Sequence, residues 1–553
     1  MRPAAWLSRY RADWLRPDLM AGLTGAAVIA PQAMAYAVIA GLPVQAGLYT
    51  ALGAMLAYPL LGTSRPLSVS TTSALAMMTA AEIALADPSG ASAPAIASTL
   101  AFLVGAMFFA AGLLRLGFIA NFISKPVLIG FEGGVGLALV VSQLKPMLGI
   151  PLTSRTTLGT LAQLPAALPA LHPVTAALGV AGVAFLLILS RAWPRVPSSL
   201  LWVAAAISAS ALLGLAARGV ELVGKVPAGL PRPALPDLTT ASDLWIGALG
   251  IALMSFTESV AAANTFIGRD DAPVNSNQEL LALGAACAAS AFAGGMPAGG
   301  GTSQTALIDG AGARSQLAQW AAAAVVAACL LFLSPTVALI PKAALGALIV
   351  KAGLGMIHPS KFRAMSIIRK EELIWALTAL AGVLVLGTLR GILLAVALSV
   401  LTMFYDASRP PIYEVAYNRQ KKVFRRVGDH ASDETFPGLL LLRAEGRINF
   451  VNAPYATEKM RALMRKADPK VVVLECGAIP DIEYTALTEL VAAQARLKAR
   501  GVPLWLANVN PDLLEVLRRS PLGAALGDEC MFFNLERVLE AWESKRAEEK
   551  HAG

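Results

Sequence analysis

The chain has 553 residues, of which 56% are hydrophobic and 15% are charged, and its formal net charge is 45 − 36 = +9. A soluble protein carries about 25% charged residues, so this composition argues against a wholly soluble protein. The positive balance does not indicate nucleic-acid binding either, because the basic residues form no patch interleaved with aromatic side chains.

Apolar stretches follow one another from residue 21 to about residue 405, with short polar breaks between them. A stretch of about 20 apolar residues is long enough to cross a bilayer as a helix. The sequence therefore predicts an α-helical polytopic membrane protein, with a transmembrane domain over residues 18–407. The predicted spans, in chain order, are 18–41, 46–62, 69–86, 96–117, 122–142, 173–191, 198–217, 243–267, 275–295, 302–312, 315–333, 336–357, 372–389 and 391–406.

Basic residues flank the predicted spans on both sides. Four arginines lie in the lead-in, residues 1–17, and six arginines and lysines lie between residues 409 and 426. By the positive-inside rule, this distribution places both ends of the chain in the cytosol, which requires an even number of crossings. We therefore expect a multi-pass protein of the cytoplasmic (inner) membrane.

Two predicted spans, 69–86 and 302–312, are short, follow Gly or Pro, and begin with small or hydroxyl residues. Short, interrupted segments at corresponding places in two halves indicate the binding site of a transporter. The hexapeptide starting at Ser70 aligns with the one starting at Thr302, at an offset of 302 − 70 = 232 residues. Each half then has seven spans, an odd number, so the second repeat (about 243–406) would run inverted relative to the first (about 18–217).

Two helices that begin near the middle of the bilayer and direct their N-termini at each other present unpaired N–H groups and two positive dipole ends. An anion is the natural ligand of such a site. The glycines of segment 299–301 would let it approach the backbone closely. The alternative is helix packing through small residues. Hydroxyl groups that could add donors belong to Ser70, Thr71, Thr72, Thr302 and Ser303.

Glu258 lies in the middle of the predicted span 243–267. A carboxylate at this depth is costly, which indicates a functional site. It could carry a co-transported proton, bind Na⁺ beside the anion, or stay neutral and hydrogen-bonded to a neighbouring helix. Glu132, near the start of the fifth predicted span, is a second acidic candidate, although it could lie at the membrane interface.

Pro31 interrupts the first predicted span, and Gln32 and Tyr36 follow it on one helix face. Gln32 could donate to the ligand or to the backbone groups that Pro31 frees. Tyr36 could pack its ring against an anion or against a neighbouring helix.

Three stretches resemble blocks of the sulfate permease (SulP) family of anion transporters, to which prestin belongs. The resemblance covers essentially the whole chain and implies seven plus seven inverted spans, divided into a core domain and a gate domain. It also implies anion binding between the third and tenth spans and an elevator-like movement of the core against the gate. The stretches are DLMAGLTGAAVIAPQAMAYAVIAGLPVQAGLY, NFISKPVLIGF with SQLKPMLG, and GMPAGGGTSQTALIDGAGARSQLA. The family's anion-contacting positions fall on Tyr36, Ser70, Thr71, Thr72, Gly300, Gly301, Thr302 and Ser303, and its acidic residue of the eighth span falls on Glu258.

The chain departs from this family at one position of the tenth span. Many relatives carry Ser-Arg-Thr where this chain has Ser303, Gln304 and Thr305. A lone anion would then depend on dipoles and hydroxyl groups alone. A bound cation, either Na⁺ or a proton on Glu258, would restore the charge balance, which favours cation-coupled symport over pure anion exchange.

After the last span, a linker (408–437) leads to residues 438–545, where strand and helix patterns alternate, and then to a tail (546–553). This pattern predicts one small α/β domain. It resembles the STAS domain that follows SulP transporters. Thr485 falls on the phosphorylatable position of the related anti-sigma-factor antagonists, with Glu483 where Asp is usual. We expect Thr485 to be a helix N-cap, with a regulatory phosphosite as the alternative.

We therefore expect a secondary transporter of bicarbonate, sulfate or a C4-dicarboxylate, and not an enzyme. The alternatives are an uncoupled exchanger, a passive anion channel and a membrane-anchored STAS signalling protein. We expect no cofactor and no metal, except for Na⁺ near Glu258 if that ion drives symport. The expected partners are the lipid bilayer, a second copy in a homodimer and a cytosolic protein bound by the STAS domain.

Overall fold

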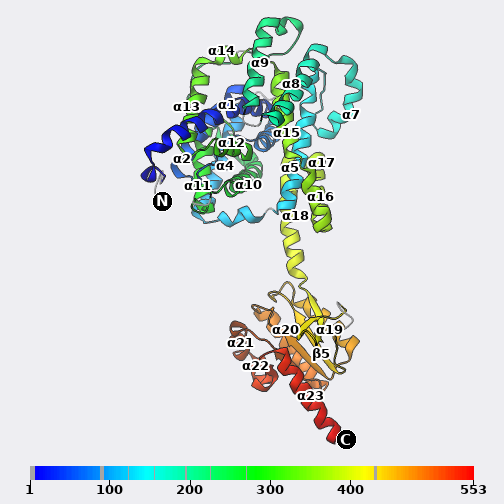
Figure 1. The fold of residues 1–553 in the computed structure, drawn as a ribbon. Coiled ribbons are helices and arrows are strands. Elements are labelled where there is room, and N and C mark those ends of the chain that lie inside the picture. Colours follow the sequence, from blue (N-terminus) through cyan, green and yellow to red (C-terminus); the bar gives the residue numbers. More distant parts are fainter. Residues whose placement is uncertain are drawn as a thin grey trace. The chain divides into compact units, whose positions relative to one another are not determined.

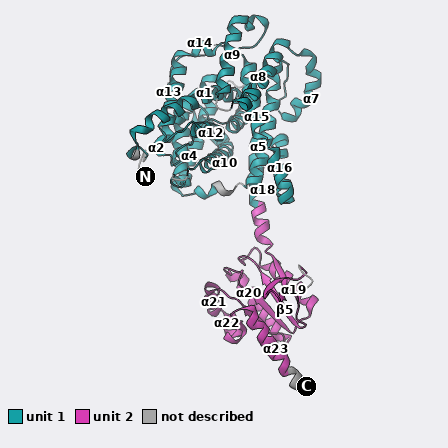
Figure 2. Cartoon of the chain, viewed as in Figure 1, with its two compact units in different colours: residues 1–400 teal, residues 401–553 magenta. Residues whose placement is uncertain are grey.

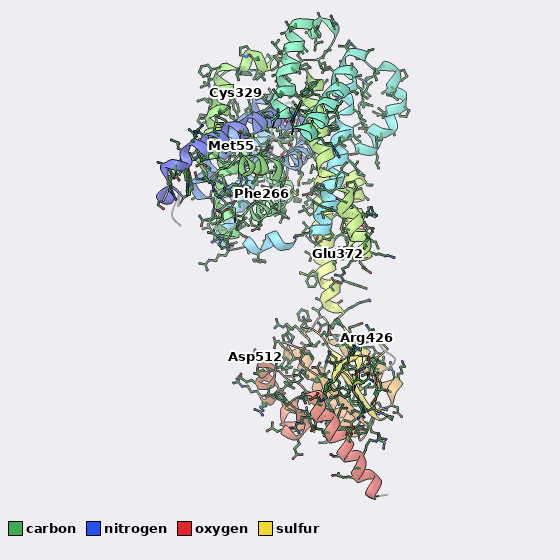
Figure 3. All side chains as sticks on the ribbon, in the orientation of Figure 1. Met55, Phe266, Cys329, Glu372, Arg426 and Asp512 are labelled. Carbon is green, nitrogen blue, oxygen red and sulfur yellow. The ribbon has the colours of Figure 1, made fainter. Side chains whose placement is uncertain are left out.

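The computed structural model describes residues 6–87, 92–122, 124–154, 156–193, 196–224, 226–233, 235–268, 271–428 and 433–552. The chain divides into two compact units, Met1–Val400 and Leu401–Gly553 (Figure 2). Figure 1 labels their elements. Each unit has its own buried core, and in the first unit the side chain of Met55, labelled in Figure 3, is fully buried.

Every predicted span contains a helix, and most helix ends lie within a few residues of the predicted ends. The largest shift is at the span predicted to begin at residue 336, where a short helix and Pro341 precede the long helix. The span helices are α1 (Leu15–Ile39), α2 (Val44–Leu61), α3 (Ser73–Ala86), α4 (Ala93–Leu113), α5 (Lys125–Ser142), α8 (Pro173–Ala192), α9 (Ser198–Leu213), α10 (Ala241–Thr265), α11 (Ser276–Phe292), α12 (Thr302–Gly310), α13 (Leu317–Phe332), α15 (Lys342–Met356), α17 (Lys370–Leu386) and α18 (Thr388–Ser408). Between them lie α6 (Leu144–Leu148), α7 (Thr157–Ala167), α14 (Ser334–Val337) and α16 (Pro359–Ile368).

Within the described residues, eight helical segments are long and apolar enough to cross a membrane. Helices α3, α9 and α13 are apolar but shorter. Helix α12 has only nine residues. The two segments that the sequence singled out as poor spans, around α3 and α12, are therefore short helices in the structure.

The helix contacts repeat between the two halves of this unit. Helix α1 packs against α12 and α13, and correspondingly α10 packs against α3 and α4. The pairs α4–α11 and α13–α2 are equivalent in the same way, as are α5–α17 and α15–α8. When the seven span helices of each half are matched in order, each of these contacts has its counterpart, which is the pattern of an internal repeat.

Two groups of helices emerge from these contacts. The first contains α1 to α4 and α10 to α13, and the second is centred on α5, α8, α15 and α17. Helices α1 and α3 contact both groups, through α9, α15 and α5. This division corresponds to the expected core and gate.

The second unit is an α/β domain with a six-stranded sheet in the order β4-β3-β5-β6-β7-β8. Strands β5 to β8 are parallel, whereas β3 is antiparallel to both β4 and β5. Buried side chains of α19 to α22 cover one face of the sheet, and those of α23 cover the other. The elements are β3 (Ile412–Asn418), β4 (Val423–Arg426), β5 (Leu439–Ala444), α19 (Ala453–Ala467), β6 (Val471–Glu475), α20 (Tyr484–Ala499), β7 (Leu504–Ala507), α21 (Pro511–Arg518), α22 (Pro521–Leu526), β8 (Met531–Phe532) and α23 (Leu535–Ala552).

The expected linker and tail require correction. Residues 408–437 contain β3 and β4, and β3 pairs with β5 at the register Tyr413↔Arg443. The charged residues of these strands, Glu414 in β3 and Arg425 and Arg426 in β4, interrupt the apolar alternation by which a strand is predicted from sequence. The expected tail, 546–553, continues α23 as far as Ala552.

Candidate functional site

Helices α3 and α12 are each introduced by a two-residue strand. Strand β1 (Val69–Ser70) pairs antiparallel with β2 (Gly299–Gly300), at the register Val69↔Gly300. Because the strands are antiparallel, the chain enters the two helices in opposite directions, as an inverted repeat requires. The N-termini of both helices reach the same cavity.

The equivalence between these segments differs from the expected one. The two helices begin at Ser73 and Thr302, which are 302 − 73 = 229 residues apart, not 232. Ser73 therefore matches Thr302, and the N-cap Thr72 matches the N-cap Gly301. The sequence alignment matched hydroxyl residues with one another, but the helix starts are set by the strand pair.

The cavity has a volume of about 860 Å³ and lies between the two helix groups. Helices α1, α3, α10 and α12 contribute one wall. Helices α5, α15 and α16 and the start of α9 contribute the other. The predicted site residues that line it are Gln32, Tyr36, Thr72, Glu132, Glu258, Gly301, Thr302, Ser303 and Gln304.

Three predicted anion contacts do not line this cavity. Ser70 and Thr71 are fully buried, and the Ser70 hydroxyl donates to Oε1 of Gln304 at 2.7 Å. The N–H of Gly300 donates to Oγ of Ser259 at 2.7 Å. In this conformation the polar groups of Ser70, Thr71 and Gly300 are directed into the protein, not into the cavity, because of their positions in and after the strand pair. They therefore form part of the packing around the site.

Thr72 connects the start of α3 to the half-buried acidic residue Glu258. As the N-cap of α3, its Oγ1 accepts from the N–H of Leu75 at 3.5 Å. The same hydroxyl donates to Oε2 of Glu258, on α10, at 3.0 Å. Glu258 therefore stands beside the start of α3, as the transport hypothesis requires.

Gln304 occupies the position where the family resemblance leads to the expectation of an arginine. Its side chain is 2% exposed and accepts from Ser70, and its Nε2 donates to Oε1 of Gln32 at 3.3 Å. The amide thus joins α12 to α1 and β1. Because the amide is neutral, this position contributes hydrogen bonds but no charge.

Positive charge is present elsewhere on the cavity wall. Lys125 on α5, Lys351 on α15 and Lys361 on α16 line the cavity. Nζ of Lys351 donates to Oγ of Ser198 at 2.8 Å, which holds the ammonium group in place. These lysines and Ser73 were not predicted from the sequence. Lys351 had a signal, since a lysine in the interior of an apolar predicted span is a functional candidate.

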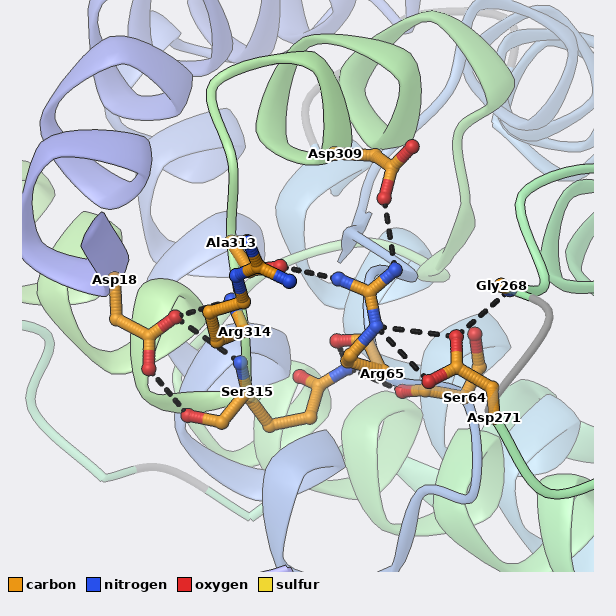
Figure 4. A network of polar contacts seen from close by, with 10 residues as sticks. Asp18, Ser64, Arg65, Gly268, Asp271, Asp309, Ala313, Arg314 and Ser315 are labelled. Atoms are coloured by element: carbon orange, nitrogen blue, oxygen red, sulfur yellow. Dashed lines mark hydrogen bonds and ion pairs between the residues drawn. The ribbon is translucent and has the colours of Figure 1, made fainter. Parts of the chain in front are cut away.

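A polar network ties the segments around α3 and α12 together (Figure 4). Nε of Arg65 contacts Asp271 at 3.1 Å and its Nη2 contacts Asp309, on α12, at 3.0 Å. Asp18 on α1 accepts from the N–H groups of Arg314 and Ser315 at 2.6 and 3.0 Å. The Arg65 contacts join the segment before β1 to α12 and to the segment before α11, and the Asp18 contacts join α1 to the loop between α12 and α13. They therefore tie α12 and its flanking segments to the first half of the unit.

In the second unit, Thr485 is not the N-cap of α20. That position belongs to Glu483, because the bridge Ile448↔Ile482 and the bond from Glu483 N–H to Ile448 O at 3.0 Å end the extended segment there. Thr485 lies in the first turn with an exposed side chain. Its phosphorylation remains a prediction. Nearby, burial raises the pKa of the Cys476 thiol to about 12, so this cysteine is a packing residue.

Comparisons with known proteins agree with both units. The sulfate permease family model matches residues 15–378, and the STAS domain model matches residues 430–533. A protein of Mycobacterium tuberculosis (strain CDC 1551) described as a probable sulfate transporter is 36% identical over 96% of this chain and 96% of its own. Sulfate transporter 3.1 of Arabidopsis thaliana is 27% identical over 97% of this chain and 86% of its own.

Solved structures show the same fold. A structure of SLC26A9 has a TM-score of 0.88 at 22% identity and covers 99% of this chain and 93% of its own. The transmembrane domain of the cyanobacterial bicarbonate transporter BicA has a TM-score of 0.60 at 25% identity, over 70% of this chain and 98% of its own.

Proposed function

Because this chain belongs to the sulfate permease family of anion transporters, we propose that it is a secondary active transporter of sulfate. Support for sulfate comes from the names of its relatives in M. tuberculosis and A. thaliana. Bicarbonate is the second candidate, favoured by the similarity to BicA over most of the transmembrane domain.

The proposed anion site is at the N-terminus of α12. Its N-cap, Gly301, has no side chain, and the first N–H groups of the helix have no acceptor within the helix. Thr302 and Ser303 are exposed to the cavity and add hydroxyl donors. An oxyanion such as sulfate would accept these N–H and O–H bonds and complement the positive end of the helix dipole.

The proposed coupling site is Glu258, acting through Thr72. The Thr72 hydroxyl has one proton, which it now donates to the Glu258 carboxylate. When a proton or Na⁺ neutralises Glu258, this carboxylate becomes a weaker acceptor and the hydroxyl can turn towards the anion. Cation binding would thereby strengthen anion binding, which is the requirement for symport. This contact, at 3.0 Å, is the observation that carries the proposal.

The charges of the cavity wall also favour an anion. Among the residues that the structure describes, three lysines and two glutamates line it, so with both carboxylates ionised their formal balance is 3 − 2 = +1. Neutralising Glu258 raises it to +2. The cation therefore makes the cavity more attractive to the anion, and Lys351 supplies a fixed charge where Gln304 does not.

An elevator-like movement is consistent with this placement. The proposed anion and cation groups lie on α1, α3, α10 and α12, all in the first helix group. Lys125, Lys351 and Lys361 lie on the facing helices. If the first helix group moved as a rigid body against the second, the proposed anion and cation groups would keep their positions relative to one another. We further propose insertion in the cytoplasmic membrane with both termini cytosolic, as the flanking basic residues indicate.

Uptake into liposomes by the purified full-length chain tests the proposal. Radiolabelled sulfate, bicarbonate and succinate would each be supplied with and without inward Na⁺ and proton gradients. We expect sulfate to accumulate against its gradient only when one of the cation gradients is present. Accumulation that ignores both gradients would contradict symport and support an exchanger, and single-channel currents would support a channel.

A further inference from the structure

A second cavity, of about 440 Å³, lies inside the unit 401–553, and no role proposed so far uses it. It is lined by α19, α20 and the sheet, whose β5 is labelled beside these helices in Figure 1. Sites for small molecules typically have volumes of about 300–1,000 Å³. The floor is formed by Leu442, Val472, Leu474 and Leu504 of three parallel strands.

The cavity exists because the facing side chains of the two helices are small or flexible. Ala456 on α19 and Ala486 and Ala493 on α20 leave space between the helices. Met460 and Met464 line the α19 side. Methionine adapts its shape to an apolar ligand more readily than branched side chains do.

The two ends of this cavity differ in chemistry. One end is apolar, where Ile448 and Ile482 form a β-bridge and Ile479 is 3% exposed. At the other end, α19 and α20 both reach their C-terminal turns, because the parallel strands make these helices run in the same direction. Four arginines line the cavity towards these turns: Arg461, Arg465, Arg496 and Arg500.

The positive charge at these turns is only partly balanced. Arg461 and Arg465 share Glu458, at 3.3 and 3.1 Å. Arg496 and Arg500 are exposed and have no ion pair among the described residues. Among the lining residues, Glu489 is the one acidic side chain. Two arginines would suffice to complement a helix end, but an apolar cavity with unpaired guanidinium groups at one end also fits a ligand with an apolar tail and an anionic head.

We propose that this cavity binds a free fatty acid. The alkyl chain lies between α19 and α20, with its methyl end towards Ile448 and Ile482, and the carboxylate pairs with Arg496 and Arg500. Burial of each further methylene strengthens binding by about fourfold until the chain fills the cavity. The site is independent of the proposed transport site, since no residue lines both cavities.

The test uses the full-length chain in phosphatidylcholine nanodiscs and a dodecanoic acid with a photoreactive diazirine near its methyl end. After irradiation, peptide mass spectrometry maps the adducts. We expect adducts within residues 448–500 that dodecanoate displaces at least about tenfold more effectively than dodecanol, because only the acid can form charged hydrogen bonds with arginine. Octanoate should compete far more weakly than dodecanoate.

The Arg496→Glu/Arg500→Glu variant should reduce these adducts at least about tenfold. Lys498→Glu is the matched control, because Lys498 is exposed on the same helix and does not line the cavity. It should leave labelling unchanged, and adducts on the membrane helices provide an internal reference for protein and lipid. Equal competition by dodecanol, equal labelling of the double variant, or adducts confined to the membrane helices would each overturn the proposal.

Discussion

The two short helices of the transport cavity, α3 and α12, begin in different ways. Helix α3 is capped by Thr72, which is 5% exposed and whose hydroxyl is engaged with Glu258. Helix α12 has the N-cap Gly301, with no side-chain cap, and its Thr302 and Ser303 are exposed. An internal repeat has therefore produced one closed and one open helix end. The open end, at α12, has free donors that suit an anionic ligand. The closed end, at α3, has a hydroxyl whose orientation depends on the charge of Glu258.

The largest effect should come from Glu258→Gln, which removes the charge from the closed end. Because a hydrogen bond to a charged group contributes up to about 3 kcal/mol, we expect the uptake that depends on the cation gradient to fall by about 100-fold. Equilibrium sulfate binding should persist. Glu371→Gln is the control, since Glu371 is exposed in the first turn of α17. Full coupled transport by the Glu258→Gln variant would refute the coupling role.

Thr72→Val keeps the shape of the closed end but removes its hydroxyl. The variant loses both the cap, worth about 1 kcal/mol, and the bond to Glu258. We expect the concentration of sulfate at half-maximal uptake to rise about 20-fold and to lose its dependence on the cation. Thr72→Ser, which retains the hydroxyl, should behave like the wild type. If the Thr72→Val variant kept its cation dependence intact, the two helix ends would not differ in role.

Thr302→Val removes a hydroxyl from the open end, where no acid is attached. The expected result is a rise of about fivefold in the half-maximal sulfate concentration, corresponding to one neutral hydrogen bond, with an unchanged cation dependence. Titration of uptake at several Na⁺ and proton concentrations separates the two quantities. Thr302→Ser serves as the matched variant. A loss of cation dependence here would erase the distinction between α3 and α12.

Lys351→Gln should have the smallest effect. Lys351 belongs to neither helix end and attracts the anion electrostatically across the cavity, without a direct hydrogen bond. We expect about a threefold weaker apparent affinity and a reduced sensitivity of uptake to ionic strength, since screening acts on this charge. Lys351→Arg should preserve both properties. Uptake assays from low to physiological salt provide the measurement, and an unchanged salt profile in the Lys351→Gln variant would argue against an electrostatic role.

The general position of this cavity was accessible from the sequence, but its inner detail was not. Hydropathy and the short segments around α3 and α12 indicated the fold and the region of the site. Which hydroxyls face the cavity depends on where each helix begins, and that is set by the β1–β2 pair, which is too short to leave a sequence pattern. For this reason Ser70 was predicted to contact the anion, and Ser73 was overlooked.

Charged residues were harder to interpret from the sequence than the hydroxyl residues. Glu258 was predicted as a site residue because it lies in the middle of an apolar span, and the same reasoning would have singled out Lys351. Lys125 and Lys361 lie at helix ends, where lysine is common and carries little information. Strands β3 and β4 were missed because their arginines and glutamate interrupt the apolar alternation, although pairing with β5 satisfies their backbone.

The pairing of Val69 with Gly300 has a consequence for biosynthesis. The partners are 300 − 69 = 231 residues apart, so the first strand emerges and enters the bilayer long before its partner has been translated. Until then its backbone groups have no acceptor or donor from the second half, which hydrocarbon surroundings do not tolerate. The substrate site therefore matures late in synthesis, and a chain truncated before Gly299 should be recognised by membrane quality control as unfinished.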